Sequence, residues 1–179
     1  MKKNLSWMLV TILICGLTTV SMSSCSKDDN DDNNGGEPAS SAIVGMKVKY
    51  YVKIESQATL DACNATVEYT DANGKTQSQA LTSLNAFSPE LVTIKGLPNK
   101  AEMKLTISPK DDWTAEKYDV DATYGIGAVA VDVQGNGKGT LDVKTEIITN
   151  KGVKTETKKT FTRTKTVTIT ADGKVGSDI

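Results

Sequence analysis

Residues 46–55 read Met-Lys-Val-Lys-Tyr-Tyr-Val-Lys-Ile-Glu, and they give the clearest indication of fold class in the chain. Apolar and polar residues alternate here with a period of two, which predicts a β-strand with one face on a core and the other in solvent. The predicted core face consists of Met46, Val48, Tyr50, Val52 and Ile54.

The same period continues downstream. Residues 63–69 predict a second strand, with Cys63, Ala65, Val67 and Tyr69 facing inward. Asp71-Ala72-Asn73-Gly74 then predicts a hairpin turn, because Asn-Gly tolerates the positive backbone angles that such turns need. A polar strand over 75–83 has the composition of a sheet edge.

Short alternating runs predict strands at 91–95 and 103–107. In the long run that follows, the apolar positions change parity between Tyr124 and Val129. Such a change requires a bulge or a bend, and Gly125-Ile126-Gly127 is the predicted place for it.

The last third of the chain continues this pattern. Residues 141–147 alternate, Asn150-Lys151-Gly152 predicts a hairpin turn, and 154–170 predicts a long final strand. The apolar face of the first of these segments is Leu141, Val143, Thr145 and Ile147. About eight strands without a helical stripe predict an all-β fold, an antiparallel two-sheet sandwich.

This layout resembles immunoglobulin-like and fibronectin-like domains in its architecture, over most of residues 42–170. The alternative is a calycin-like β-barrel with a ligand cavity. We expect residues 42–179 to form one sandwich domain.

The N-terminus has the organisation of a secretory signal. Lys2 and Lys3 precede an apolar run over 5–20, which is short for a membrane span of roughly 20 residues. Small residues then lead into Cys25, so we expect residues 1–24 to be removed.

Met22-Ser23-Ser24-Cys25 resembles the lipobox of bacterial lipoproteins, which implies a lipid, palmitate included, on Cys25 and an anchor in the outer membrane. The next residues, Lys27-Asp28-Asp29, resemble the export signal of surface lipoproteins in the Bacteroidetes. The resemblance implies an acidic, lipidated tether over 25–41 and a domain on the extracellular side. The alternative is a lipoprotein that faces the periplasm.

Composition excludes several classes of chemistry. The chain has no His, which removes His-based triads and His-metal sites, and we expect no metal and no cofactor. Between Pro38 and Ile179 there are 18 basic and 17 acidic residues, a balance that argues against nucleic-acid binding. Cys63 is the single thiol expected in the domain, and we interpret it as a small buried hydrophobe.

The candidate ligand-binding residues are Trp113, Asp111 and Asp112, in a polar loop where an aromatic face beside two acids suits a sugar or a protein. The alternative is that Trp113 caps the core. Asp119 and Asp121 could join the two loop acids around Ca²⁺, although a solvent-facing strand explains them better. We expect a non-catalytic binding or structural module; the alternative is a small carboxylate-dependent hydrolase such as a glycosidase.

Overall fold

A computed structural model describes residues 42–157 and 159–178, all of which belong to one compact unit, Glu37–Ile179. The predicted signal peptide and tether, with Cys25 and the triplet Lys27-Asp28-Asp29, lie outside the described residues. Within the described ranges no helix has the length and apolar character needed to cross a membrane.

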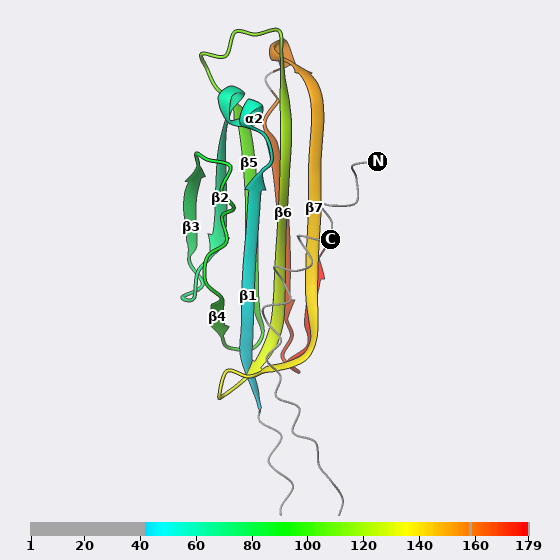
Figure 1. Cartoon of the computed structure of the whole chain (residues 1–179). Helices are drawn as coiled ribbons and strands as arrows, with labels where there is room; N and C mark the ends of the chain where they lie inside the picture. The colour runs from blue at the N-terminus through cyan, green and yellow to red at the C-terminus, as the bar shows by residue number, and fades with distance from the viewer. Residues whose placement is uncertain (1–41, 158, 179) are drawn as a thin grey trace, which may run out of the picture. The chain divides into compact units, whose positions relative to one another are not determined.

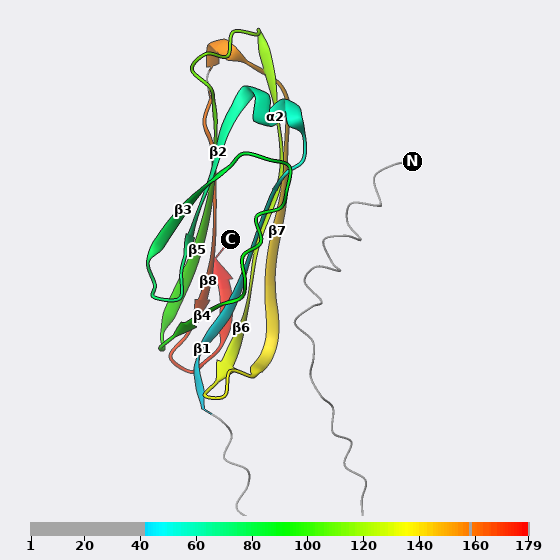
Figure 2. The same ribbon diagram turned by 60° about the vertical axis from the view of Figure 1, so that its left-hand side comes forward.

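Two antiparallel sheets make up this unit (Figures 1 and 2). The first has the strand order β4-β1-β6-β7 and the second β3-β2-β5-β8-β9. The strands are β1 Ile43–Ile54, β2 Cys63–Thr70, β3 Thr76–Leu81, β4 Val92–Lys95, β5 Asn99–Pro109, β6 Lys117–Asp132, β7 Gly137–Lys154, β8 Phe161–Ile169 and β9 Val175–Asp178. Neither sheet closes on itself. The two-sheet sandwich is confirmed, and the barrel alternative is wrong.

The connections differ from those of an immunoglobulin constant domain, whose first two strands are neighbours in one sheet. Here β1 and β2 lie in different sheets and are joined by a short helix, α2 (Gln57–Ala62). The resemblance to immunoglobulin-like domains therefore concerns the architecture.

The core lies between the two inner faces. All five residues of the predicted apolar face of β1 are at most 1% exposed, and Cys63, Ala65 and Val67 of β2 are buried opposite them. Burying a side chain of the size of Val or Ile stabilises the fold by about 1.5–3 kcal/mol. The period of two therefore identified the core-facing residues of these two strands correctly.

Helix α2 was not predicted, because six residues are too few to show a helical period. Ser56 caps it by accepting a hydrogen bond from the backbone N of Thr59. The Thr59 hydroxyl donates to Asp119 O at 3.1 Å and accepts from Asp121 N at 3.0 Å, which fixes the helix to β6.

The bulge predicted at Gly125-Ile126-Gly127 is wrong. Strand β6 pairs with β1 in one register through this segment. Its even-numbered residues belong to the core, so Val129 and Val131 lie on the outer face. Both faces of β6 are buried here, so apolar residues occupy both parities. The nearest irregularity lies further on, where the pairing of β6 with β7 shifts between Ala128 and Ala130. The glycines make room on the outer face. A Cβ on Gly125 would be 2.9 Å from Lys144 O and from Thr145 Oγ1, and one on Gly127 would contact Val143.

The predicted face of β7 is turned outward, and the hairpin at Asn150-Lys151-Gly152 does not form. Ile147 is 54% exposed, whereas its neighbour Ile148 is buried in the core. The pairing of β7 with β6 shifts between the Tyr118 and Val120 positions, so Gly152 lies in an irregularity of a continuous strand.

The final predicted strand is divided. A 3-10 turn, η2 (Thr155–Thr157), precedes β8, and a turn over 170–174 leads into β9. This turn has the same hydrogen bonding as the turn 71–75. In each turn a side-chain oxygen of the first residue accepts a hydrogen bond from the backbone N of the fifth residue. The fourth residue of each is a Gly with positive φ, +80° at Gly173 and +74° at Gly74. The first residue is Thr170 in one turn and Asp71 in the other.

Candidate functional site

Loops gather at the two ends of the sandwich. We define the distal end as α2, residues 110–116 and η2, which lie together at the top of Figure 1. Two backbone hydrogen bonds join these segments: Lys110 N donates to Ala62 O at 2.9 Å, and Thr155 N donates to Glu116 O at 3.0 Å. The entry end is the opposite one, where the described chain enters β1. Its turns are 71–75, 96–98, 133–136 and 170–174. Gly96 N donates to Val44 O, and Ile43 pairs with Asp132.

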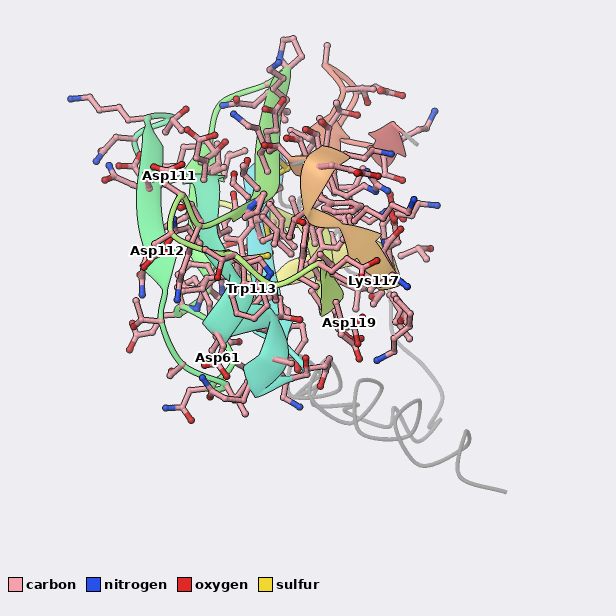
Figure 3. All side chains as sticks on the ribbon, turned by 90° about the horizontal axis from the view of Figure 1, so that it is seen from above. Asp61, Asp111, Asp112, Trp113, Lys117 and Asp119 are labelled. Carbon is pink, nitrogen blue, oxygen red and sulfur yellow. The ribbon has the colours of Figure 1, made fainter. Side chains whose placement is uncertain are left out.

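Trp113 lies over the middle of the distal end, as the view from above shows (Figure 3). Its ring is partly buried and packs against the core, and its backbone N donates to Lys110 O at 3.3 Å. The indole Nε1 is buried without a hydrogen-bond partner. The ring therefore covers the end of the core, as the capping interpretation predicts, and leaves part of its surface to solvent.

Asp111 and Asp112 are exposed and lie to one side of Trp113, while Lys117 and Asp119 lie to the other (Figure 3). The four acids considered for Ca²⁺ are therefore not brought together. Within the described residues no group of three or more Cys, Asp or Glu side chains is placed to hold a metal ion.

Asp119 and Asp121 have structural partners on β7. The Asp119 carboxylate accepts from Gly152 N at 2.7 Å and lies 3.6 Å from Lys151 Nζ. Asp121 Oδ1 accepts from the Thr149 hydroxyl at 3.4 Å. These bonds hold the irregular part of β7 against β6.

Cys63 is 2% exposed, and burial raises the pKa of its thiol to about 11. A thiol with such a pKa is protonated at neutral pH and is a poor nucleophile. The interpretation of Cys63 as a buried hydrophobe is confirmed.

A polar cluster that the sequence analysis missed joins the two sheets around Glu146 of β7. The Tyr124 hydroxyl donates to Glu146 Oε2 at 2.9 Å, Arg163 Nε donates to Oε1 at 3.2 Å, and Lys165 Nζ lies 3.4 Å from Oε2. Partial burial acts to raise the pKa of Glu146, but the Tyr124 hydroxyl and the two cations lower it overall. Burial and the Glu146 charge raise the pKa of Tyr124.

One signal for this cluster is present in the sequence, since Arg163 is the single Arg of the chain. Its fork of donors suits a carboxylate, which is a reason to look for an acidic partner. The partner itself was not predictable, because it lies in the other sheet.

No family model matches the chain, and neither the curated proteins nor the solved structures include a match. The fold and the geometry of the two ends are therefore the basis for a functional proposal.

Proposed function

We propose that the protein is a lipoprotein of the outer membrane, exposed on the cell surface, whose sandwich domain binds a glycan or a protein, or has a structural role, without catalysis. Cys25 carries the lipid, Lys27-Asp28-Asp29 directs export, and residues 25–41 connect the anchor to the domain. The lipobox and the triplet support this proposal by resemblance.

One observation links the proposed location of the protein to the proposed binding site. The chain enters the domain at the end opposite to the Trp113 loop (Figure 1). Strand β1 has 12 residues and spans about 36 Å between the two ends. An anchor at Cys25 attaches through the entry end, so the distal end is the one farther from the point of attachment. Binding residues concentrate on such loops, held by a rigid scaffold.

The chemistry of the loop indicates the class of ligand. The carboxylates of Asp111 and Asp112 are exposed acceptors for hydroxyl or amide donors, and the accessible part of Trp113 offers an apolar surface beside them. Sugars and polar peptide segments present this combination of donors and apolar faces.

The anchor is tested by Cys25→Ala. Several acyl chains, at about 0.8 kcal/mol per buried methylene, hold the wild type in the membrane fraction, and the variant is expected in the soluble or secreted fraction. Mass spectrometry of the wild type should find an acylated N-terminal peptide that begins at Cys25. An unmodified Cys25 in membrane-bound protein contradicts the proposal.

The ligand-binding end is tested with the double variant Asp111→Ala, Asp112→Ala on a glycan array and in a pull-down of surface proteins. Asp172→Ala, at the entry end, is the matched control. We expect the loop variant to lose the ligands of the wild type and the control to keep them. Equal binding by both variants removes the distal loop as the binding site.

A further inference from the structure

Strand β7 forms a long open edge of the first sheet. It has 18 residues, and among the strands that the structure describes only β6 pairs with it, so its other side presents backbone N–H and C=O groups along the flank of the domain (Figure 1). Edge strands of soluble proteins are usually short or contain Pro, because a long edge is a template for another strand. No Pro occurs between Gly137 and Lys154. The edge of β7 is therefore able to accept a further strand.

The central part of this edge is regular and has an uncharged outer face. The pairing of β7 with β6 is irregular between residues 138 and 142 and between 150 and 153, whereas 142–150 keep one register. The outer face of this regular part includes Val143, Thr145 and Ile147, of which Ile147 is 54% exposed. Charged side chains are the usual means of preventing a strand from pairing at an edge, and this face has none between 142 and 150.

The opposite face of β7 carries charges of alternating sign. Asp142, Lys144 and Glu146 lie on the side of Ile148, which is part of the core. Among the described residues the Asp142 and Lys144 side chains take part in no ion pair, and the Glu146 side chain remains 38% exposed beside its partners. Inward-pointing charges exclude any strand that brings like charges against them. A partner strand must therefore match this order of charges.

A second copy of β7 matches it in one antiparallel register. With Thr145 opposite Thr145 of the second copy, Lys144 lies opposite Glu146, and the two-fold symmetry repeats this pair. On the outer face the same register places Val143 opposite Ile147, also twice. Residues 142–148 of both copies pair within their regular parts, so the ladder needs no bulge.

The neighbouring registers are less favourable. A centre at Lys144 or at Glu146 places like charges directly opposite each other. A centre at Val143 pairs Lys144 with Asp142 but draws the irregular residues 139–141 into the ladder. A centre at Ile147 brings no like charges together but leaves Lys144 and Glu146 opposite uncharged residues. Charge and regularity together select Thr145.

We propose that the edge of β7 is a homodimer interface, in which two copies of this chain pair antiparallel about a two-fold axis at Thr145. The four-stranded sheets of the two copies join into one continuous sheet through an isologous contact. Backbone hydrogen bonds and the contacts of Val143 with Ile147 supply the affinity. The Lys144–Glu146 pairs set the register, since Glu146 already has two cationic partners and gains little from a third.

This inference goes beyond the proposed function and does not depend on it. Because the paired strands are antiparallel, the entry ends of the two copies lie at opposite ends of the dimer. With the two-fold axis along the membrane normal the two copies are equivalent, so both anchors reach the same membrane.

The oligomeric state tests the interface without the anchor. The probe is the chain from residue 25 onward with Cys25→Ala, which carries no lipid and retains every described residue. Sedimentation equilibrium over a series of concentrations should show a reversible monomer–dimer equilibrium.

A disulfide tests the register. Thr145→Cys places the two new thiols opposite each other across the axis, within the Cα separation that a disulfide allows, so mild oxidation should cross-link the dimer. Thr149→Cys makes the same change at another exposed position of the same face, but there the two thiols are about 27 Å apart and should not cross-link. Native Cys63 is 2% exposed and is the same in both variants.

A lysine on the edge tests the contact itself. Ile147→Lys replaces an exposed apolar side chain by a charge opposite Val143, twice in each dimer, and should raise the dissociation constant at least about tenfold. Leu84→Lys, at a position that is 39% exposed between β3 and β4, is the matched control and should dimerise as the wild type does. A native far-UV circular dichroism spectrum shows that each variant is folded.

A probe that stays monomeric at the highest attainable concentration overturns the proposal. A dimer that Ile147→Lys and Leu84→Lys affect equally also overturns it, because such a dimer uses another surface. Equal cross-linking by the two cysteine variants overturns the register. These results leave the anchor untested because the probe has no acyl chain, and an unmodified Cys25 in cells contradicts the proposed function without affecting the dimer.

Discussion

Gly125 shows how one residue without a side chain shapes the outer face of the first sheet. Its Cβ position is blocked by Lys144 O and Thr145 Oγ1, both at 2.9 Å, and a backbone oxygen cannot move aside easily. At Gly127 the nearest atom is Val143 Cγ2 at 3.4 Å, which is ordinary contact with a side chain that can adjust.

Gly125→Ala should therefore destabilise the domain by about 1–3 kcal/mol, the usual cost of overpacking. Gly127→Ala is the matched control and should change the free energy of unfolding by less than about 1 kcal/mol. Urea denaturation measures both. Equal effects of the two substitutions would show that Gly125 is not sterically required.

Trp113 has a structural role that can be separated from binding. Its ring packs on the core but remains partly exposed, so Trp113→Ala should cost about 2 kcal/mol, less than the 3–5 kcal/mol of a fully buried aromatic residue. Trp113→Phe should restore about half of this loss. The measurement is urea unfolding, together with acrylamide quenching of the single Trp in the chain from residue 25 onward. Full quenching with unchanged stability would contradict the packing described here.

At the scale of elements, the polar cluster around Glu146 ties β7 of one sheet to β8 of the other. Because the pKa of Glu146 is lowered in the folded state, its contribution to stability is present above its ordinary value of 4.5 and is lost as the pH falls through the folded pKa. The contribution is modest, since the side chains of Glu146 and Arg163 are 38% and 41% exposed.

Glu146→Gln should lower the free energy of unfolding by about 1 kcal/mol at pH 7. The difference from the wild type should shrink as the pH falls below about 4.5. Glu68→Gln, which breaks an ion pair with Lys104 within the second sheet, is the control and should have a smaller effect at pH 7. Chemical denaturation across this pH range measures both, and a pH-independent difference for Glu146→Gln would exclude the ionic contribution.

Strands with one buried face and one solvent-exposed face were predictable from the sequence, whereas strands with both faces buried were not. β1 and β2 alternate because water contacts one side of each, so period and burial agree. Both faces of β6 are buried, so apolar residues occupy consecutive positions and the period of two disappears. In the sequence this change of pattern was mistaken for a bend. The orientation of β7 depends on the glycines of its partner, which its own sequence does not contain.

The candidate site divides in the same way. The polar loop around Trp113 was identifiable because turn residues and a lone aromatic residue occur together in the sequence. Its position at the far end from the chain entry was not, because that depends on how the strands are ordered in two sheets. The Glu146 cluster requires three strands to meet, and contacts of that kind leave no local pattern.

At the scale of the whole molecule, the proposed function depends on two features. One is the predicted export signal near the N-terminus, and the other is the position of the Trp113 loop at the end of the domain opposite to the chain entry. Lys27-Asp28-Asp29 is expected to direct export without contributing to the fold. Replacing all three by Ala should leave the thermal midpoint unchanged and protect the protein from protease added to intact cells. Undiminished surface cleavage of this variant would contradict the export role.

The most direct test of the central claim, a lipid-anchored domain that displays its distal end, is cysteine labelling on intact cells. Asp112→Cys places an exposed thiol in the distal loop, and native Cys63 stays silent because it is 2% exposed with a pKa of about 11. A membrane-impermeant maleimide should label this variant on intact cells, in the membrane fraction. Labelling that appears only after the cells are lysed would contradict surface display.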